Sequence, residues 1–281
     1  MANLRKIRTR IKSVQSTQQI TKSMKMVAAS KLRRTQTAFG DLRGFAEKSG
    51  EILSRLGVGA EDNPYLTPRP ACRTRCYVLI VGNRGLCGTY NTALLRYLQE
   101  QRESDGGEAF LVVAGRWGKD MIQTLELPIR RSFEISDTPS SAEAQELTDY
   151  LQELYREGEA DEIVLVFQQF RSVLSQNPGR KTLLPLTPAE DAVTSGDVIF
   201  EPDRKTLLDS LVEIYLDNTV HAALLEARTG EHASRMTAMT SASDNTEELI
   251  AKLTLELNHA RQSAITTEIS EIVGGAEALK K

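Results

Sequence analysis

The chain has 281 residues, with 35 Lys and Arg against 38 Asp and Glu, and its net charge of -3 argues against a bulk basic nucleic-acid binder. Hydrophobic residues make up 40 % but aromatic residues only 5 %, which is sparse for one large compact core and favours helix outside such a core. No apolar run approaches the ~18 residues of a membrane-spanning helix, and the first twenty residues lack the apolar stretch of a signal peptide, so we expect a cytosolic protein.

The N-terminal segment, residues 1–58, is basic and is predicted to be one long helix. It carries 13 basic and 3 acidic side chains, and its first 40 positions contain ten Lys or Arg and no acid, which should attract an acidic partner. It contains no proline, which costs ~3 kcal/mol inside a helix. A spacing of three and four predicts a heptad seam with a polar middle, at Leu4, Ile7, Ile11, Val14, Gln18, Thr21, Lys25, Ala28, Leu32, Thr35, Phe39, Leu42, Ala46, Ser49, Leu53 and Leu56.

The middle of the chain, residues 70–200, is predicted to be an α/β domain. Three apolar runs look like buried parallel strands, at Cys76–Val81, Phe110–Ala114 and Ile163–Phe167. They alternate with amphipathic stretches at 91–103, 116–125 and 142–156, which predicts a small Rossmann-like sheet. The run 182–186 fits an edge segment, because Pro185 does not suit a central strand, and 187–200 is a connector.

The glycine-rich turn GNRGLCG, residues 82–88, follows the first predicted strand. One interpretation is a phosphate cradle at a helix N-terminus, and the other is a tight turn that needs positive φ. We favour the turn, because the glycine spacing matches neither the dinucleotide nor the P-loop motif and no Lys-Ser/Thr or ribose-binding acid follows. No nucleotide site is predicted.

Other reactive side chains do not form a recognisable site. His221, His232 and His259 are eleven and twenty-seven residues apart and cannot act as an i, i+4 metal pair on one helix. Cys72, Cys76 and Cys87 lack a second pair or a nearby His, so reduced structural thiols are expected, although their role is not determined. We predict no catalytic residue, no cofactor and no metal.

The C-terminal segment, residues 203–281, is predicted to be a second long helix, with Asp203 as a possible N-cap after Pro202. Its seam stops being strongly apolar at residues 232–246, which hold six Ser or Thr and no Leu, Ile, Val or aromatic residue. The two arms would form an antiparallel coiled coil of roughly 85 and 110 Å, so the second would overhang by about 25 Å. The seam positions are Leu208, Leu211, Tyr215, Ala222, Leu225, Met236, Met239, Ile250, Leu253, Leu257, Ala260 and Ala264.

Four long strings of residues point to a family. They are ITKSMKMVAASKLR (20–33), GNRGLCGTYN (82–91), HASRMTAMTSASDNTEELI (232–250) and ARQSAITTEISEIVGGAEAL (260–279). Together, and in this order around an α/β domain, they resemble the gamma subunits of F-type ATP synthases over essentially the whole chain. The resemblance implies a non-catalytic central-stalk rotor, one copy per complex, that couples ion-driven rotation of the c-ring to ATP synthesis or hydrolysis in a ring of alpha and beta subunits.

The resemblance also implies roles for particular residues. Contacts with the catch region of the beta subunit would fall on Arg261 and Gln262, with Thr266 and Glu268 one turn further on, and on Met24 of the other arm, which is expected to face them. A basic track that meets acidic beta-subunit loops would comprise Lys12, Lys22, Lys25, Lys31, Arg33 and Arg34. An apolar bearing tip would comprise Ile269, Ile272, Val273, Ala276 and Leu279.

The remaining partners implied by the resemblance are the epsilon subunit and the c-ring, with Phe200 and Glu201 placed on their side. The segment after residue 186 carries no Cys, unlike the regulatory insert of some photosynthetic relatives, so thiol control of that kind is not expected. The resemblance and the lack of a transit peptide favour a bacterial protein, held through its partners on the cytoplasmic face of the plasma membrane. Two alternatives stay open from the residues alone: a Rossmann-type nucleotide-binding enzyme with helical arms, and a structural coiled-coil tether.

Overall fold

The structure is a computed structural model that describes residues 2–56, 63–67, 69, 72–117, 119–186 and 203–278. These residues form two compact units. The first, which we call the terminal helix pair, comprises residues 1–27 and 236–281, and the second, the body, comprises residues 28–235. Helix α1 (Ala2–Leu56) and helix α5 (Arg204–Ala278) each contribute to both units.

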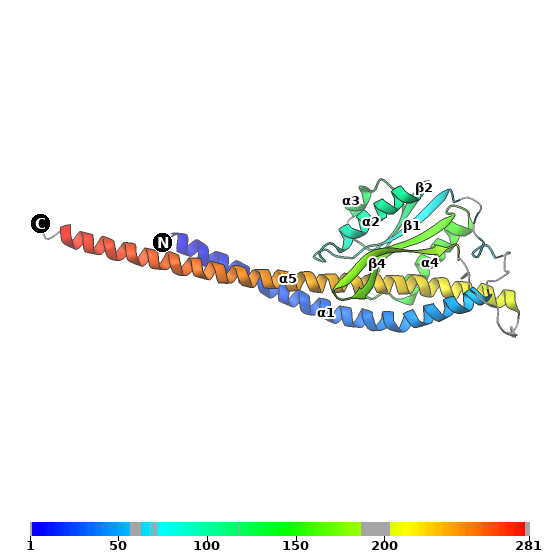
Figure 1. The fold of residues 1–281 in the computed structure, drawn as a ribbon, viewed down its shortest axis with the longest axis horizontal. Coiled ribbons are helices and arrows are strands. Elements are labelled where there is room, and N and C mark those ends of the chain that lie inside the picture. Colours follow the sequence, from blue (N-terminus) through cyan, green and yellow to red (C-terminus); the bar gives the residue numbers. More distant parts are fainter. Residues whose placement is uncertain are drawn as a thin grey trace. The chain divides into compact units, whose positions relative to one another are not determined.

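The body contains a five-stranded mixed sheet, which confirms the predicted α/β class (Figure 1). Its order is β3-β2-β1-β4-β5, with β1 (Thr74–Ile80), β2 (Glu108–Ala114), β3 (Ile129–Phe133), β4 (Glu162–Ser172) and β5 (Ser175–Leu184). The first four strands are parallel, and β5 pairs with β4 in antiparallel fashion. The crossovers are α2 (Tyr90–Asp105), α3 (Lys119–Gln123) and α4 (Ser141–Arg156), as a parallel sheet requires.

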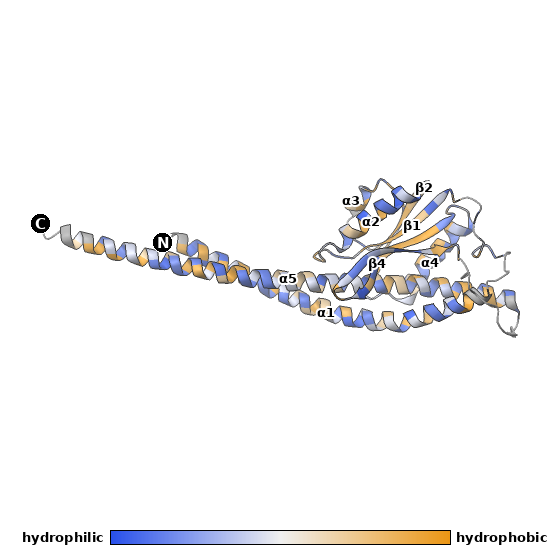
Figure 2. Cartoon of the chain, viewed as in Figure 1, coloured by the Kyte–Doolittle hydropathy of each residue, from blue (hydrophilic) through white to orange (hydrophobic). Residues whose placement is uncertain are grey.

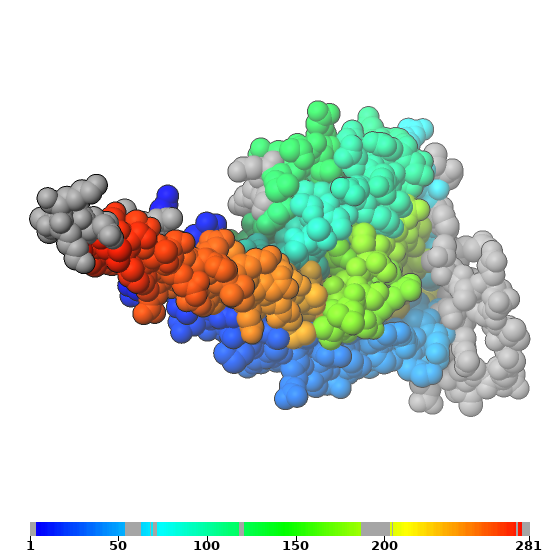
Figure 3. Space-filling model, turned by 60° about the vertical axis from the view of Figure 1, so that its left-hand side comes forward, coloured from blue at the N-terminus to red at the C-terminus, as the bar shows by residue number. Residues whose placement is uncertain are grey.

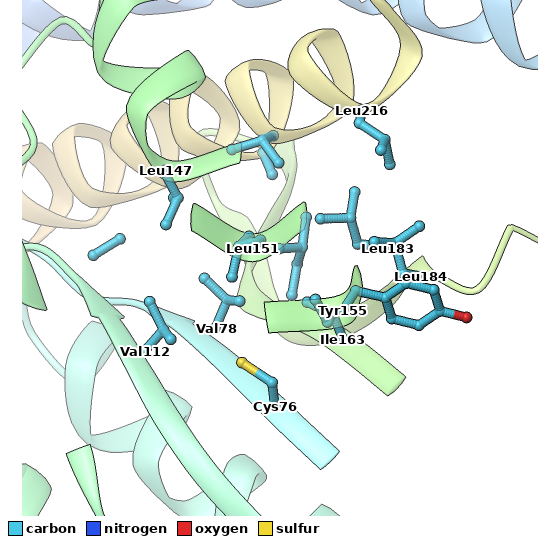
Figure 4. Close-up of a cluster of buried hydrophobic side chains, with 14 of the residues drawn as sticks. Cys76, Val78, Val112, Leu147, Leu151, Tyr155, Ile163, Leu183, Leu184 and Leu216 are labelled. Carbon is cyan, nitrogen blue, oxygen red and sulfur yellow. The ribbon is translucent and has the colours of Figure 1, made fainter. Parts of the chain in front are cut away.

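Both faces of the central strands are buried. Along β1, Cys76 and Val78 belong to one apolar cluster, while Tyr77 and Leu79 belong to another on the opposite face. The first cluster includes Leu151 of α4 and residues from the body's part of α5, and Figure 4 shows several of these side chains converging. The second cluster includes residues of α2 and α3. The central strands are accordingly the most uniformly hydrophobic part of the sheet in Figure 2.

Two strands differ from the sequence prediction. Strand β3 was missed because only Phe133 of its five residues is buried, so that it lacks an apolar run. Strand β5 begins at Ser175, seven residues before the predicted edge segment, and includes Pro178. Proline is tolerated there because β5 lies at the edge of the sheet, and Pro185 follows the last strand residue.

The body's parts of α1 and α5 run antiparallel. A Cβ added to Gly50 would meet the Tyr215 ring at 3.2 Å, whereas Arg43, further back along α1, is close enough to Glu226, further along α5, for their charges to interact. Every described position of both predicted seams is buried or half-buried, in the body and in the terminal helix pair alike. The predicted seam positions are therefore shielded from solvent wherever they are described, although Leu208 belongs to the apolar cluster of the sheet; the side chain of Leu56 lies outside the described ones.

Candidate functional site

The terminal helix pair has a paired part and an unpaired part. Burial along α5 ends at Ala264, and every side chain described from Ile265 onward is exposed. Within this unit the blue N-terminal residues lie along the orange part of α5, and the red end continues beyond them (Figure 3). Because α5 reaches Ala278, roughly 20 Å of helix at ~1.5 Å per residue has no partner helix, close to the predicted overhang.

The unpaired part of α5 carries an exposed apolar stripe. Ile269, Ile272 and Val273 are 56 %, 65 % and 57 % exposed, and Ala276 is exposed as well. Leu279, the last residue predicted for this tip, lies outside the described residues. A contiguous apolar stripe of this kind is typical of a surface that another protein covers.

The predicted catch residues of α5 lie just where the pairing ends. Arg261, Gln262, Thr266 and Glu268 are all exposed, and the Thr266 hydroxyl donates to the Gln262 carbonyl at 3.0 Å. They therefore present polar groups to solvent on two successive turns. Their contact with a beta subunit stays a prediction.

The expected placement of Met24 opposite these residues is wrong. The helices run antiparallel and α1 begins at Ala2, near the point where burial of α5 ends at Ala264. Met24 is about twenty residues further along α1, so it lies about 30 Å from Arg261 at ~1.5 Å per residue. The two sites belong to opposite ends of the terminal helix pair.

The predicted basic track contains five free cations and one engaged one. In the terminal helix pair Lys12 and Lys22 are exposed and Lys25 is half-buried, and in the body Arg33 and Arg34 are exposed. None of these five has an ionic partner among the residues that the structure describes. Lys31, by contrast, forms an ion pair with Asp137 of the body, so its charge already has a partner within the chain.

The glycine-rich turn, residues 82–88, has the tight geometry that the sequence favoured. Leu86 and Gly88 adopt positive φ, at 60° and 58°. Asn91 closes the turn by accepting a hydrogen bond on Oδ1 from the Gly82 N–H at 2.9 Å. The body's part of α5 packs against this turn, since the Ser234 hydroxyl donates to the Cys87 carbonyl at 2.7 Å.

A buried ionic cluster joins α5 to this turn. Glu231 is 1 % exposed and accepts hydrogen bonds from Arg228 Nη1 at 2.7 Å and from Arg235 Nη2 at 2.6 Å. Asn83 links the cluster to α1, because its Nδ2 donates to Asp137 Oδ1 at 3.1 Å and Asp137 pairs with Lys31. The cluster thus connects both long helices to the body's sheet.

The surroundings of the cluster shift the pKa values of its ionisable side chains. Burial alone would raise the pKa of Glu231, but the charges of Arg228 and Arg235 outweigh it and lower that pKa. Burial likewise opposes ionisation of Asp137, but hydrogen bonds from Lys31 and Asn83 lower its pKa. Burial lowers the pKa of His232, despite the nearby Glu231. Glu231 and Asp137 are therefore charged at neutral pH and His232 is neutral.

This cluster was not predicted as a site from the sequence. Arg228, Glu231 and Arg235 are spaced by three and four, which places them on one face of a helix and was visible in the sequence. Such a pattern usually indicates a solvated helix surface. Only the structure shows that the face is covered by the glycine-rich turn, about 150 residues away in the chain.

Cysteine and histidine have local roles in the structure. All three cysteines are free, with Cys72 exposed and Cys76 and Cys87 buried. Nε2 of His221 lies 3.0 Å from the Pro139 carbonyl, and His259 is exposed. Within the described ranges, no group of three or more His, Cys, Asp or Glu could hold a metal ion. Phe200 and Glu201 lie outside those ranges.

Comparison with known proteins identifies the family. A family profile described as ATP synthase matches residues 3–279. The ATP synthase gamma chain of Moorella thermoacetica is 43 % identical, with all of both chains covered, and that of Desulfitobacterium hafniense is 43 % identical with the same coverage. The chain belongs to the ATP synthase gamma chain family. The recognition made from the four residue strings is confirmed, and with it the expectation of a non-catalytic subunit.

Chains from solved ATP synthase structures share this fold. The chain superposes on one from the Euglena gracilis mitochondrial ATP synthase (OSCP/F1/c-ring) with a TM-score of 0.71 at 21 % identity, covering 99 % of this chain and 95 % of that one. A chain from the central stalk and c-ring of the Tetrahymena thermophila mitochondrial ATP synthase gives a TM-score of 0.62 at 25 % identity, with 80 % and 99 % coverage. Among the described helices, none is long and apolar enough to cross a bilayer.

Proposed function

We propose that this chain is the non-catalytic rotor shaft of an F-type ATP synthase, which couples ion-driven rotation of the c-ring to ATP synthesis or hydrolysis in the alpha/beta hexamer. The observation that carries the proposal is the match to bacterial gamma chains over the full length of both sequences. The chain would be present once per complex and would touch the membrane only through its partners. Its place is then the cytoplasmic face of a bacterial plasma membrane.

The end of the helix pairing is the proposed contact for the beta-subunit catch region. Arg261 offers a planar fork of donors to a carboxylate, and Gln262 beside it offers a neutral donor and acceptor. Both are exposed, as are Thr266 and Glu268 on the next turns. Exposed polar contacts worth ~0 to 1 kcal/mol each can break as readily as they form, which a turning shaft requires. Met24 lies about 30 Å from Arg261 along the helix pair, so it would contact a different part of the hexamer.

The basic track is proposed for Lys12, Lys22, Lys25, Arg33 and Arg34. With no ionic partner among the described residues, these cations are free to meet acidic loops of successive beta subunits. Exposed ion pairs of ~0 to 1 kcal/mol would guide the shaft without locking it. Lys31 is the least suited member, because its ammonium group is already paired with Asp137.

The apolar tip is proposed to turn inside an apolar sleeve formed by the hexamer. Ile269, Ile272 and Val273 are more than half exposed, and Ala276 and Leu279 would extend the same surface. Apolar contact is non-directional, so a rotor can slide along it without losing hydrogen bonds. Phe200 and Glu201 are proposed to lie on the side of the epsilon subunit and c-ring.

The contact proposal is tested in an assembled complex with paired substitutions. Arg261→Ala with Gln262→Ala should change coupled ATPase activity, because both polar contacts of the proposed catch are lost. Lys252→Ala with Asn258→Ala is a matched control, since these exposed residues of the same helix also combine a cation with an amide. Equal effects of the two pairs would contradict the assignment. An unchanged activity of the Arg261 and Gln262 variant would favour a passive tether.

Co-purification tests the rotor proposal itself. A tagged chain should bring down alpha, beta, epsilon and c subunits with one gamma per complex, and a complex without a nucleotide-hydrolysing hexamer would overturn the proposal. Titration of the chain with ATP and with NAD tests the enzyme alternative. We expect no stoichiometric binding, because Glu231 fills the space beside the glycine-rich turn where a phosphate would have to sit.

A further inference from the structure

The β1–α2 turn has the features of an anion-binding site. It follows the carboxyl end of β1, the edge at which open α/β sheets place their ligands. The Asn83 N–H lies 3.3 Å from each carboxylate oxygen of Glu231. A Cβ on Gly82 would stand 3.0 Å from Cδ of Glu231, so a glycine at this position leaves the room that the carboxylate occupies.

Helix α5 supplies the other half of the site. Arg228 and Arg235 each donate to a different oxygen of Glu231, at 2.7 and 2.6 Å. Two guanidinium groups and a backbone N–H around one carboxylate are the donors that proteins use to bind carboxylates and phosphates. All three ionic residues are at most 8 % exposed, so none could be buried without the others at an acceptable cost.

The two arginines in turn depend on the body's loops. Arg228 Nη1 donates to the Val81 carbonyl at 3.0 Å, and Arg235 Nη2 donates to the Arg84 carbonyl at 3.0 Å. The accepting carbonyls belong to residues before and after Asn83, so the turn surrounds the ionic group. Separation of α5 from the turn would leave the carbonyls and both guanidinium groups without these partners.

We propose that the β1–α2 turn is an anion site whose occupant is the chain's own Glu231, and that this internal carboxylate is the joint that fastens α5 to the sheet. Glu231 is thus a positioning residue. The consequence for rotation rests on the proposed function: a shaft that transmits torque needs its long helix fixed to the α/β sheet. A chain lacking the carboxylate should contain an empty site selective for a small oxyanion.

The test is chemical rescue in the full chain. The sole tryptophan, Trp117, donates its backbone N–H to the Gly82 carbonyl at 2.9 Å, so its fluorescence reports unfolding next to the site. Glu231→Ala should raise the unfolding constant by about a hundredfold or more, because it breaks a buried ion cluster. Sodium formate should recover about tenfold or more of this loss through binding to the folded chain, and sodium chloride of equal ionic strength should not.

Two variants make the rescue specific. Glu231→Gln keeps the shape of the side chain but not its charge, so it should be destabilised and should not respond to formate. Glu226→Ala removes another glutamate of α5, which accepts a hydrogen bond from the Phe170 N–H at 2.8 Å and, among the described residues, accepts none from an arginine. It should also show no formate response.

The outcomes separate the joint from the rotor role. Stability of Glu231→Ala equal to the parent chain, or a response to formate no larger than that to chloride, would overturn the joint. An equal formate response from Glu226→Ala would do the same. If Glu231→Ala does not fold in chloride, its refolding yield in formate is measured instead. A yield that formate fails to increase would then contradict the joint. One combined result would support the rotor role and reject the joint. In it, the assembled complex with Glu231→Gln pumps fewer ions per ATP, but formate does not rescue the stability of Glu231→Ala.

Discussion

Arg228 is a buried cation, and we expect the hydrogen-bonding geometry of its guanidinium group to contribute more to the stability of the body than its charge does. It is 1 % exposed, and its guanidinium donates five hydrogen bonds. The acceptors are the carbonyls of Ser136, Val81 and Ile135, Asn83 Oδ1 and Glu231 Oε2, at 2.7 to 3.3 Å. Substitution Arg228→Lys keeps the charge and removes the fork, so it isolates the contribution of the hydrogen-bond geometry.

The expected loss follows from counting donors. A lysine ammonium has three N–H groups, so at least two of the five acceptors lose their hydrogen bond from residue 228. A hydrogen bond to a charged group contributes ~1.5 to 3 kcal/mol, but part of the loss is compensated, because water can reach the exposed Ser136 and the Ile135 carbonyl also accepts from Asn83 Nδ2 at 2.7 Å. We therefore expect Arg228→Lys to lower the free energy of unfolding by about 2 kcal/mol.

Urea unfolding followed by Trp117 fluorescence measures this loss. Arg96→Lys serves as the control, because Arg96 is exposed on α2 and should change the unfolding free energy by less than ~0.5 kcal/mol. A shift for Arg228→Lys as small as that of the control would refute the reasoning. It would mean that charge alone holds the cluster and that the fork contributes nothing.

Three further outcomes are expected. Burial lowers the pKa of His232 below its unfolded value of about 6.5, so its contribution to stability is complete above that pH and declines as the pH falls. The pKa values of Glu231 and Asp137 are also lowered, so both stay charged in this range. His232→Gln should reduce the pH dependence of the unfolding free energy between about pH 7 and pH 5, measured by urea titrations. An unchanged slope of the unfolding free energy against pH would contradict this. Gly115→Ala should lower the unfolding free energy by more than ~2 kcal/mol, since Gly115 has φ +125° and a Cβ would come within 2.4 Å of the Val81 carbonyl. Gly40→Ala, at an exposed position inside α1 with open space for a Cβ, should be neutral or stabilising, and the same result for Gly115→Ala would rule out the steric argument. Ile269→Ser with Ile272→Ser should reduce self-association of the isolated chain in sedimentation, and self-association equal to that of the parent would show that the stripe is not the adhesive surface.

The helices and the central strands could be predicted from the sequence because each is buried in a regular period. Seam positions such as Leu32 and Leu253 recur every three or four residues, and the strand that contains Val78 is apolar throughout. Strand β3 could not be predicted, since an edge strand with one buried residue has no such period. The misplaced Met24 has a different cause: the resemblance supplied a set of contacts but no register between the helices.

The Ser/Thr-rich stretch of α5 is partly explained by how closely that helix approaches the turn. Ala233 is fully buried and Ser234 donates to the Cys87 carbonyl, so a large apolar side chain at either position would push the helix away. The nearby Tyr90 hydroxyl donates to the Ala227 carbonyl at 2.7 Å, a bond that also needs a close approach. A composition that looks poor for a coiled-coil seam is therefore suited to packing a helix against a backbone turn.

Burial separates the charges of this chain into two classes that the sequence lists together. Arg228 and Arg235 are fixed by several short hydrogen bonds in a medium where an unpaired ion is costly, so they suit a permanent joint. Lys12 and Lys22 are solvated, so any ion pair that they form is weak, screened by salt and quickly exchanged. A rotor needs both classes: strong ionic contacts where its parts must not move, and weak ones where it passes other proteins. Net charge cannot distinguish them, because the distinction depends on what covers each side chain.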